Sequence, residues 1–330
     1  MGEEHVIQVS ELTMTYQVKE NQTTTFRDSL TAMLHPHYRQ IPALKGISFQ
    51  VARGDILGYV GENGAGKSTT IKSLLGILKP TSGTITVLGH DPFTHRKENA
   101  PRIAALMGQK SQLWWELPLM DSFKFLQKMY GNVGPTEDQW LTTMIERLEM
   151  TSFVHQSVRE LSLGQRMRGE FVATFLHHPE LVFLDEPTLG LDVPTRKRVL
   201  DFLLEINQRE HTTIVFTSHE MADIEKVANR LLLLNHGTIA YRGDVQDFVG
   251  QYRTLRDIQA AGHVDPSRVL QPGVTIFRRN KESVEFLVDT TKVNDQQMLT
   301  QLSQLPDVTG VQFLPVNLET ILAIRGERHD

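Results

Sequence analysis

Nine consecutive residues have the types and spacing of a phosphate-binding loop. They fit the pattern G-x-x-x-x-G-K-[ST] without a mismatch and are Gly61, Glu62, Asn63, Gly64, Ala65, Gly66, Lys67, Ser68 and Thr69. Glycines let backbone N–H groups turn toward an anion, the lysine reaches the terminal phosphates, and the serine hydroxyl is a Mg²⁺ ligand. A strand is predicted at 56–60 and a helix at 68–78, whose N-terminus adds positive charge. An ordinary glycine-rich turn would leave Gly-Lys-Ser without a role, so we predict a nucleoside triphosphate site.

Two carboxylates end a second apolar run. Residues 181–184 are Leu-Val-Phe-Leu, and Asp185, Glu186 and Pro187 follow them. At the end of a buried strand, Asp185 is placed to hold Mg²⁺, and Glu186 has the reach to deprotonate an attacking water. The alternative is that both acids cap the next helix, but Pro187 and Thr188 already supply that start. The pair predicts hydrolysis of the bound nucleotide.

Further motifs complete an ordered set. Leu-Ser-Leu-Gly-Gln occupies 161–165, Leu-Asp occupies 191–192, Thr-Ser-His-Glu occupies 217–220, and Gln109 follows an apolar strand. With these motifs in this order, residues 6–250 resemble the ABC ATPase family, the nucleotide-binding subunits of ATP-binding-cassette transporters. Leu163 stands where the family's commonest signature, LSGGQ, has its first glycine.

The resemblance implies that two such subunits face each other head to tail. Each ATP then lies between the phosphate-binding loop of one subunit and Ser162, Gly164 and Gln165 of the other. These three residues head a predicted helix, so their amides and hydroxyl suit an anion. By itself the segment could equally be a helix N-cap and its first turn.

The resemblance also assigns three single residues. His219 would contact the γ-phosphate and position the water with Glu186, and Gln109 would sense Mg²⁺ and that water. Tyr16 would stack on adenine, since an aromatic face gives base affinity with few hydrogen bonds. The alternatives are a solvated loop histidine, a surface amide and a partly buried surface tyrosine.

Composition limits the other possibilities. A net charge of -5 argues against a nucleic-acid partner, and the absence of cysteine fits a reducing compartment. The acidic N-terminus does not read as a secretory signal, and no apolar run reaches the length of a membrane span. We therefore expect any membrane role to come through partners, at the cytoplasmic face of the cell membrane.

The predicted fold class is α/β: a P-loop NTPase core with the antiparallel β subdomain and helical subdomain of ABC proteins, plus a small C-terminal α+β domain. We place the first domain at 1–250, with an insertion at about 17–42, and an accessory or dimerisation domain at 251–330. In the second domain the pattern predicts a hairpin from 274–278 and 284–288, a helix at 294–305, a strand at 308–314 and a final helix. Residues 257–270 are polar and mixed, and no element is predicted there.

Large apolar residues gather after Gln109. In the family this region opens the helical subdomain, where a helix of the membrane subunit docks. We expect Phe123 and Leu126 inside, and Trp114 or Trp115 together with Leu117 at the surface; the alternative is that all are core. The resemblance thus implies an exporter-type ATPase, a homodimer or a heterodimer with a second ABC ATPase, acting on separately encoded transmembrane permease subunits with ATP and Mg²⁺. The alternative is a non-transport ABC ATPase, an assembly or translation-associated factor.

Overall fold

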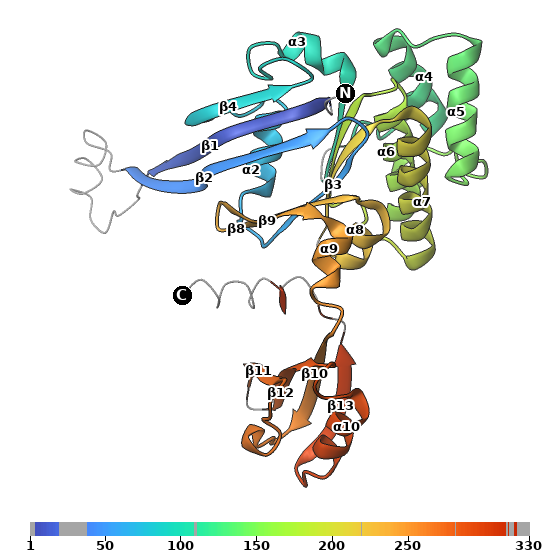
Figure 1. The fold of residues 1–330 in the computed structure, drawn as a ribbon. Helices are drawn as coiled ribbons and strands as arrows, with labels where there is room; N and C mark the ends of the chain where they lie inside the picture. The colour runs from blue at the N-terminus through green and yellow to red at the C-terminus, as the bar shows by residue number, and fades with distance from the viewer. Residues whose placement is uncertain are drawn as a thin grey trace, which may run out of the picture. The chain divides into compact units, whose positions relative to one another are not determined.

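The computed structural model describes residues 4–19, 38–108, 111–218, 220–280, 282–314, 316 and 320–321. The chain divides into two compact units, Met1–Arg242 and Gly243–Asp330 (Figure 1). This division assigns the short helix α9 (Val245–Gly250) to the second unit, whereas the boundary predicted from sequence follows that segment.

A six-stranded sheet forms the centre of the first unit. Its order is β5 (Ile103–Met107), β6 (Leu181–Asp185), β7 (Thr213–Thr217), β3 (Ile56–Gly61), β8 (Arg230–Asn235) and β9 (Thr238–Asp244). Neighbours from β5 to β8 are parallel. Strands β3 and β7 are buried throughout, as expected for a parallel sheet covered on both faces.

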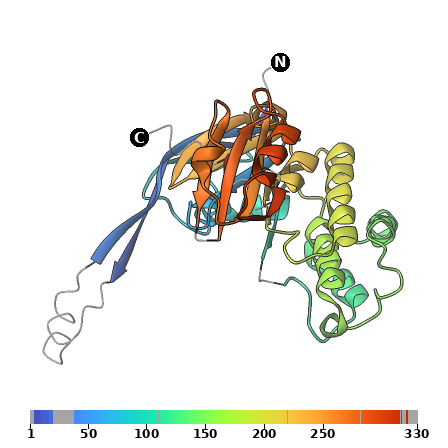
Figure 2. The ribbon, with the colours of Figure 1, turned by 90° about the horizontal axis from the view of Figure 1, so that it is seen from below.

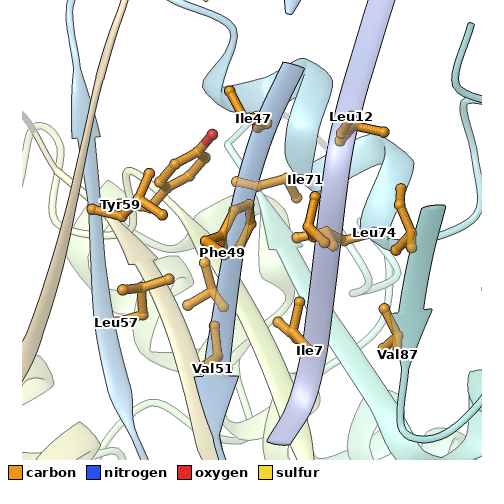
Figure 3. Close-up of a cluster of buried hydrophobic side chains, with 14 of the residues drawn as sticks. Ile7, Leu12, Ile47, Phe49, Val51, Leu57, Tyr59, Ile71, Leu74 and Val87 are labelled. Atoms are coloured by element: carbon orange, nitrogen blue, oxygen red, sulfur yellow. The ribbon is translucent and has the colours of Figure 1, made fainter. Parts of the chain in front are cut away.

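A three-stranded antiparallel sheet packs in the same unit. It is formed by β1 (His5–Lys19), β2 (Tyr38–Ala52) and β4 (Ser82–Val87), with β1 in the middle. Side chains of this sheet, of β3 and of helix α2 (Lys67–Leu74) share one apolar core, shown in Figure 3. The core therefore fixes α2 against both sheets.

Helix α2 ends earlier than predicted. The sequence pattern extends to Leu78, but the N–H of Ile77 bonds the carbonyl of Lys72 at 2.8 Å and closes the last turn after Leu74. Such a bond ends a helix because it uses a terminal carbonyl that another turn would need.

Strands β1 and β2 continue beyond β4 as a two-stranded ribbon. The pairing with β4 ends at Thr13↔Ser82, whereas β1 and β2 stay paired from Thr15↔Pro42 to Lys19↔Tyr38. The blue ribbon in Figure 2 extends away from the rest of the unit. Both ends of the insertion predicted at about 17–42 are therefore strands, because cross-strand pairing continues from Pro42 to Tyr38. Residues 20–37 of that insertion lie outside the described residues.

Helices form the other part of the first unit. The helical layer comprises α4 (Leu119–Tyr130), α5 (Pro135–Arg147) and α6 (Leu163–Phe175), which lie together in Figure 1. In the described part of this unit, further α-helices are α3 (Arg96–Asn99), α7 (Val193–Glu210) and α8 (Met221–Val227). Within the described ranges, no helix is both long enough and apolar enough to cross a membrane.

The second unit contains a four-stranded sheet, and helix α10 (Asp295–Ser303) packs against it. The order is β11 (Val274–Arg279), β12 (Ser283–Asp289), β10 (Leu255–Gly262) and β13 (Val308–Leu314), and α10 closes the core. The hairpin, the helix and the last strand agree with the sequence prediction. The prediction missed β10, whose core face carries only Ile258 and Ala260, with the polar residues Asp257 and Gln259 beside them in the sequence. Of the predicted final helix, the structure describes Thr320 and Ile321 as helical.

Candidate functional site

The predicted catalytic segments leave the same edge of the parallel sheet. Strand β7 lies between β6 and β3, and all three run in the same direction. The phosphate-binding loop follows β3, the two carboxylates end β6, and residues 217–220 follow β7. Carboxyl ends of neighbouring parallel strands are the usual ligand site of such sheets.

The phosphate-binding loop adopts a conformation that depends on glycine. Gly66, the N-cap of α2, has φ 111°, and a Cβ there would lie 2.7 Å from Leu44 and 2.8 Å from the carbonyl oxygen of Ala43. A Cβ at Gly64 would meet nothing within 4 Å, so this part of the loop has open space beside it. Backbone amides at a helix N-terminus beside such space make an anion cradle, which fits a phosphate chain.

Lys67 is held inside this loop. Its side chain is buried, and Nζ donates to the carbonyl oxygens of Gly61 at 2.7 Å and Glu62 at 3.0 Å. Burial lowers the pKa of Lys67, and the negative charges of Glu186 and Asp185 oppose that shift. Two loop carbonyls and two nearby carboxylates thus favour an ammonium ion at the point where terminal phosphates are expected.

The carboxylate pair is fixed by a residue of the neighbouring strand. The buried hydroxyl of Thr217 donates to Asp185 Oδ1 at 2.8 Å and accepts the backbone N–H of Glu186 at 2.9 Å. Glu186 has φ 51°, a left-handed conformation that is uncommon for a residue with a Cβ. Strained backbone of this kind persists where surrounding bonds enforce it.

Sequence reasoning did not single out Thr217. It stands beside the predicted histidine in the Thr-Ser-His-Glu segment, but a threonine at the end of a strand carries no signal of its own. Only the pairing Asp185↔Thr217 between β6 and β7 brings its hydroxyl to both acids.

Tyr16 and Ser68 lie close to the loop. The Tyr16 hydroxyl is 3.1 Å from Thr69 Oγ1, which places the ring beside the first turn of α2 with 37% of the residue exposed. Ser68 is exposed on that turn. Both positions are compatible with the roles predicted for them, a ring that contacts the base and a hydroxyl that contacts a metal.

The segment 161–165 forms the start of α6. Ser162 is the N-cap: its Oγ accepts the N–H of Gln165 at 3.2 Å, and Gln165 Oε1 accepts the N–H of Ser162 at 2.9 Å. A helix N-cap is the alternative to an ATP contact for this segment. Within one chain the capping box is compatible with either role. Leu163 is 44% exposed, and the nearby apolar residues Leu189 and Val193 are 66% and 78% exposed.

Two predicted site residues lie outside the described residues. Gln109 belongs between Gly108, which follows β5, and Ser111, and His219 belongs between Ser218 and Glu220. Their roles stay predictions. Over the described positions, no group of three or more His, Cys, Asp or Glu side chains is placed to hold a metal ion.

The large apolar residues that follow Gln109 divide between the core and the surface as expected. Phe123 and Leu126 are buried, whereas Trp114, Trp115 and Leu117 are 37%, 51% and 39% exposed. We call these last three residues the docking surface. The Trp114 ring meets exposed Phe125 edge-on at 4.5 Å, so apolar groups continue from it onto α4.

Comparisons with known proteins agree with this geometry. The family model described as ABC transporter matches residues 44–189. The chain is 27% identical to "ABC transporter ATP-binding protein NatA" of Bacillus subtilis over 65% of its own length and 87% of that protein. It is 34% identical to "Probable multidrug ABC transporter ATP-binding protein YbhF" of Escherichia coli over 62% of this chain, but spans only 35% of YbhF.

Solved structures confirm the predicted fold class. "Structure of ATP binding subunit of ABC transporter" aligns with 75% of this chain and 93% of that one, with a TM-score of 0.60 and 23% identity. A dimeric cassette, MJ0796 bound to ADP and Pi in a post-hydrolysis state, aligns with 72% of this chain and 98% of that one at TM-score 0.60 and 20% identity. Residues 44–189 therefore form an ABC transporter domain, an ATP-binding and ATP-hydrolysing cassette, in a chain whose similar proteins are ATP-binding subunits of ABC transporters.

Proposed function

We propose that this ATPase is an exporter-type subunit that hydrolyses ATP between two head-to-tail copies of the cassette. The observation that carries the proposal is the meeting of Lys67, Asp185 and Glu186 at one sheet edge, where burial and charge fix the three groups together. The phosphate chain of ATP would follow the loop of residues 61–69, and the adenine would lie against Tyr16.

The chemistry requires a base and a cation near the transferring phosphoryl group. Glu186 accepts a proton from the attacking water, and the Thr217 bond to its backbone keeps the carboxylate in place. The ammonium group of Lys67 stabilises the negative charge that develops on the transferring phosphoryl group, because a cation already held at that position lowers the barrier. His219 and Gln109 complete the site as the family resemblance implies.

The donor set near the loop fits Mg²⁺. Ser68 and Asp185 supply oxygen ligands, which Mg²⁺ prefers, and one or two protein oxygens with substrate phosphates are its usual set. Gln109 is the third candidate. When held by these residues, Mg²⁺ would neutralise the negative charge that develops on the transferring phosphoryl group.

The partners follow from the relatives. NatA and YbhF are named as ATP-binding proteins of transporters, and another structural relative, cbiO1, is described as part of a transporter complex. We propose that the docking surface receives an apolar helix of a separately encoded permease, which holds the chain at the cytoplasmic face of the membrane. An exposed aromatic surface that continues onto α4 suits the helix-in-groove mode.

Glu186→Gln tests the mechanism together with the assembly. The variant keeps the fold and the ATP site but lacks the base, so ATP bound from both sides holds the dimer closed. We expect a dimer in size-exclusion chromatography with Mg²⁺-ATP, and mainly a monomer for the unmodified chain with ADP.

A crosslinking control separates this closure from a dimer held by the C-terminal unit. The chain has no cysteine, so a pair placed at Ser162 and Gly64 reports on the ATP interface alone. Crosslinks that form equally with ATP, with ADP and without nucleotide contradict the proposal.

A further inference from the structure

A buried carboxylate outside the nucleotide site joins two segments of the first unit. Glu170, on α6, is only 4% exposed. The Ser111 hydroxyl donates to one of its oxygens, and the backbone N–H of Gln112 donates to the other at 3.0 Å. A buried carboxylate needs such donors, because its desolvation is otherwise costly. Glu170 therefore holds residues 111–112 on α6.

Two further contacts fasten the same segment. Gln112 Nε2 donates to Thr174 Oγ1 at 3.1 Å, one turn further along α6. A Cβ on Gly169 would lie 2.7 Å from Leu119 and 3.1 Å from Leu113, so glycine allows the close approach of Leu113 to the helix. Residues 111–113 and α6 are thus packed as one body.

The two ends of this connection are segments that the proposed function uses. Residues 111–113 come directly after the position of Gln109, and α6 begins at Ser162. Within the described residues, Glu170 is the buried charged group that bonds the first segment to the helix carrying the second.

We propose that Glu170 is a positioning residue that couples residues 111–113, which follow the predicted sensor Gln109 in the chain, to the helix that presents Ser162 to the opposing ATP. The inference rests on the proposed function, since it assigns no chemistry to Glu170 itself. When the segment after Gln109 shifts with the nucleotide state, Glu170 makes α6 follow it, so the phosphate-contacting end of α6 reaches the partner subunit only in the ATP state.

For this coupling Glu170 needs two hydrogen-bonding atoms at the end of its side chain, one for Ser111 and one for Gln112. Burial raises the pKa of Glu170, and the bonds from Ser111 and Gln112 oppose that shift. Glutamine keeps both connections, because its carbonyl accepts the Gln112 N–H while its amide donates to the Ser111 hydroxyl, which is both donor and acceptor. Alanine keeps neither.

The test compares Glu170→Ala, Glu170→Gln and a control, Ile145→Ala, which truncates a buried side chain of α5 in the same helical layer. Thermal unfolding, ATP affinity and kcat are measured for each, and ATP-dependent dimerisation is measured in the Glu186→Gln background. For Glu170→Ala we expect unchanged ATP affinity of the monomer, kcat lowered about tenfold and about tenfold more ATP required for dimerisation. Glu170→Gln should behave as the unmodified chain, and Ile145→Ala should lose stability while keeping kcat.

If kcat and ATP-dependent dimerisation of Glu170→Ala equal those of the unmodified chain, the inference is overturned. It is also overturned if Ile145→Ala, at the same loss of stability, loses kcat to the same extent. If Glu170→Ala does not fold, Ser111→Ala removes one of the two bonds and must show the same division between retained ATP affinity and reduced dimerisation. Failure of the proposed function is distinguishable, because the chain with Glu170 intact would then neither hydrolyse ATP nor dimerise with it.

Discussion

Replacing Thr217 with valine tests how Asp185 and Glu186, the proposed catalytic carboxylates, are positioned. The substitution keeps the shape of a fully buried side chain and removes one hydroxyl. The two short bonds of that hydroxyl are one to the Asp185 carboxylate and one from the N–H of Glu186, beside a longer contact of 3.5 Å to the Leu184 carbonyl oxygen. A bond to a charged group contributes about 1.5–3 kcal/mol and a neutral one about 1 kcal/mol. The left-handed backbone of Glu186, which costs about 1–2 kcal/mol, loses a bond that supports it.

Not all of this energy raises the barrier, because water replaces part of the lost bonding. We expect about 2 kcal/mol to appear in the chemical step, which lowers kcat about 30-fold. ATP affinity should change little, because Thr217 makes no bond to Lys67 or to the phosphate-binding loop. Steady-state hydrolysis and equilibrium binding of a fluorescent ATP analogue measure the two quantities separately.

Thr217→Ser is the matched control, since it keeps the hydroxyl and loses a methyl group. It should retain most of kcat even where its stability falls. A Thr217→Val protein that hydrolyses ATP as fast as the unmodified chain would refute the assignment of Thr217 as the residue that orients Glu186.

Three other changes have expected outcomes. Lys67→Ala should weaken ATP binding and reduce turnover by about 10²–10³-fold, because a preorganised donor to the transition state is lost; Lys72→Ala, on the exposed side of α2, is the control, and turnover surviving without Lys67 removes it from the site. Trp115→Asp should prevent co-purification with the membrane subunit in detergent while basal hydrolysis continues; co-purification that persists with all three residues of the docking surface replaced would defeat the docking proposal. The ion pair with Arg102 lowers the pKa of Glu180 below its usual 4.5, so its stabilising effect is present above that value and is lost as the pH falls through the lower folded-state pKa. In Glu180→Gln the thermal midpoint should therefore fall less steeply as the pH is lowered, and an unchanged slope would contradict this reasoning.

Local patterns in the sequence predicted the segments that carry the chemistry. The loop at 61–69, the carboxylates after 181–184 and the cap at Ser162 each depend on neighbouring residues along the chain. The same holds for the hairpin and helix of the second unit, where period-2 and period-3.6 patterns are clear. The burial of Phe123 and the exposure of Trp114, Trp115 and Leu117 agree with the division expected from the family resemblance.

Long-range pairing decided the rest. Strand β10 is central in its sheet although its sequence mixes polar residues with few large apolar ones, because β12 and β13 supply its partners. The two-stranded ribbon from Thr15↔Pro42 onward is likewise formed by cross-strand hydrogen bonds, which no local sequence pattern predicted.

The positioning residues depend on tertiary structure in the same way. Thr217 reaches Glu186 across a strand boundary, 31 residues apart in the chain, and Glu170 reaches Ser111 across 59. A hydroxyl or a carboxylate has no distinctive sequence signal until the fold brings its partner within bonding distance. The sequence by itself therefore predicted which groups would act on ATP, and the tertiary structure decided which groups hold them in place.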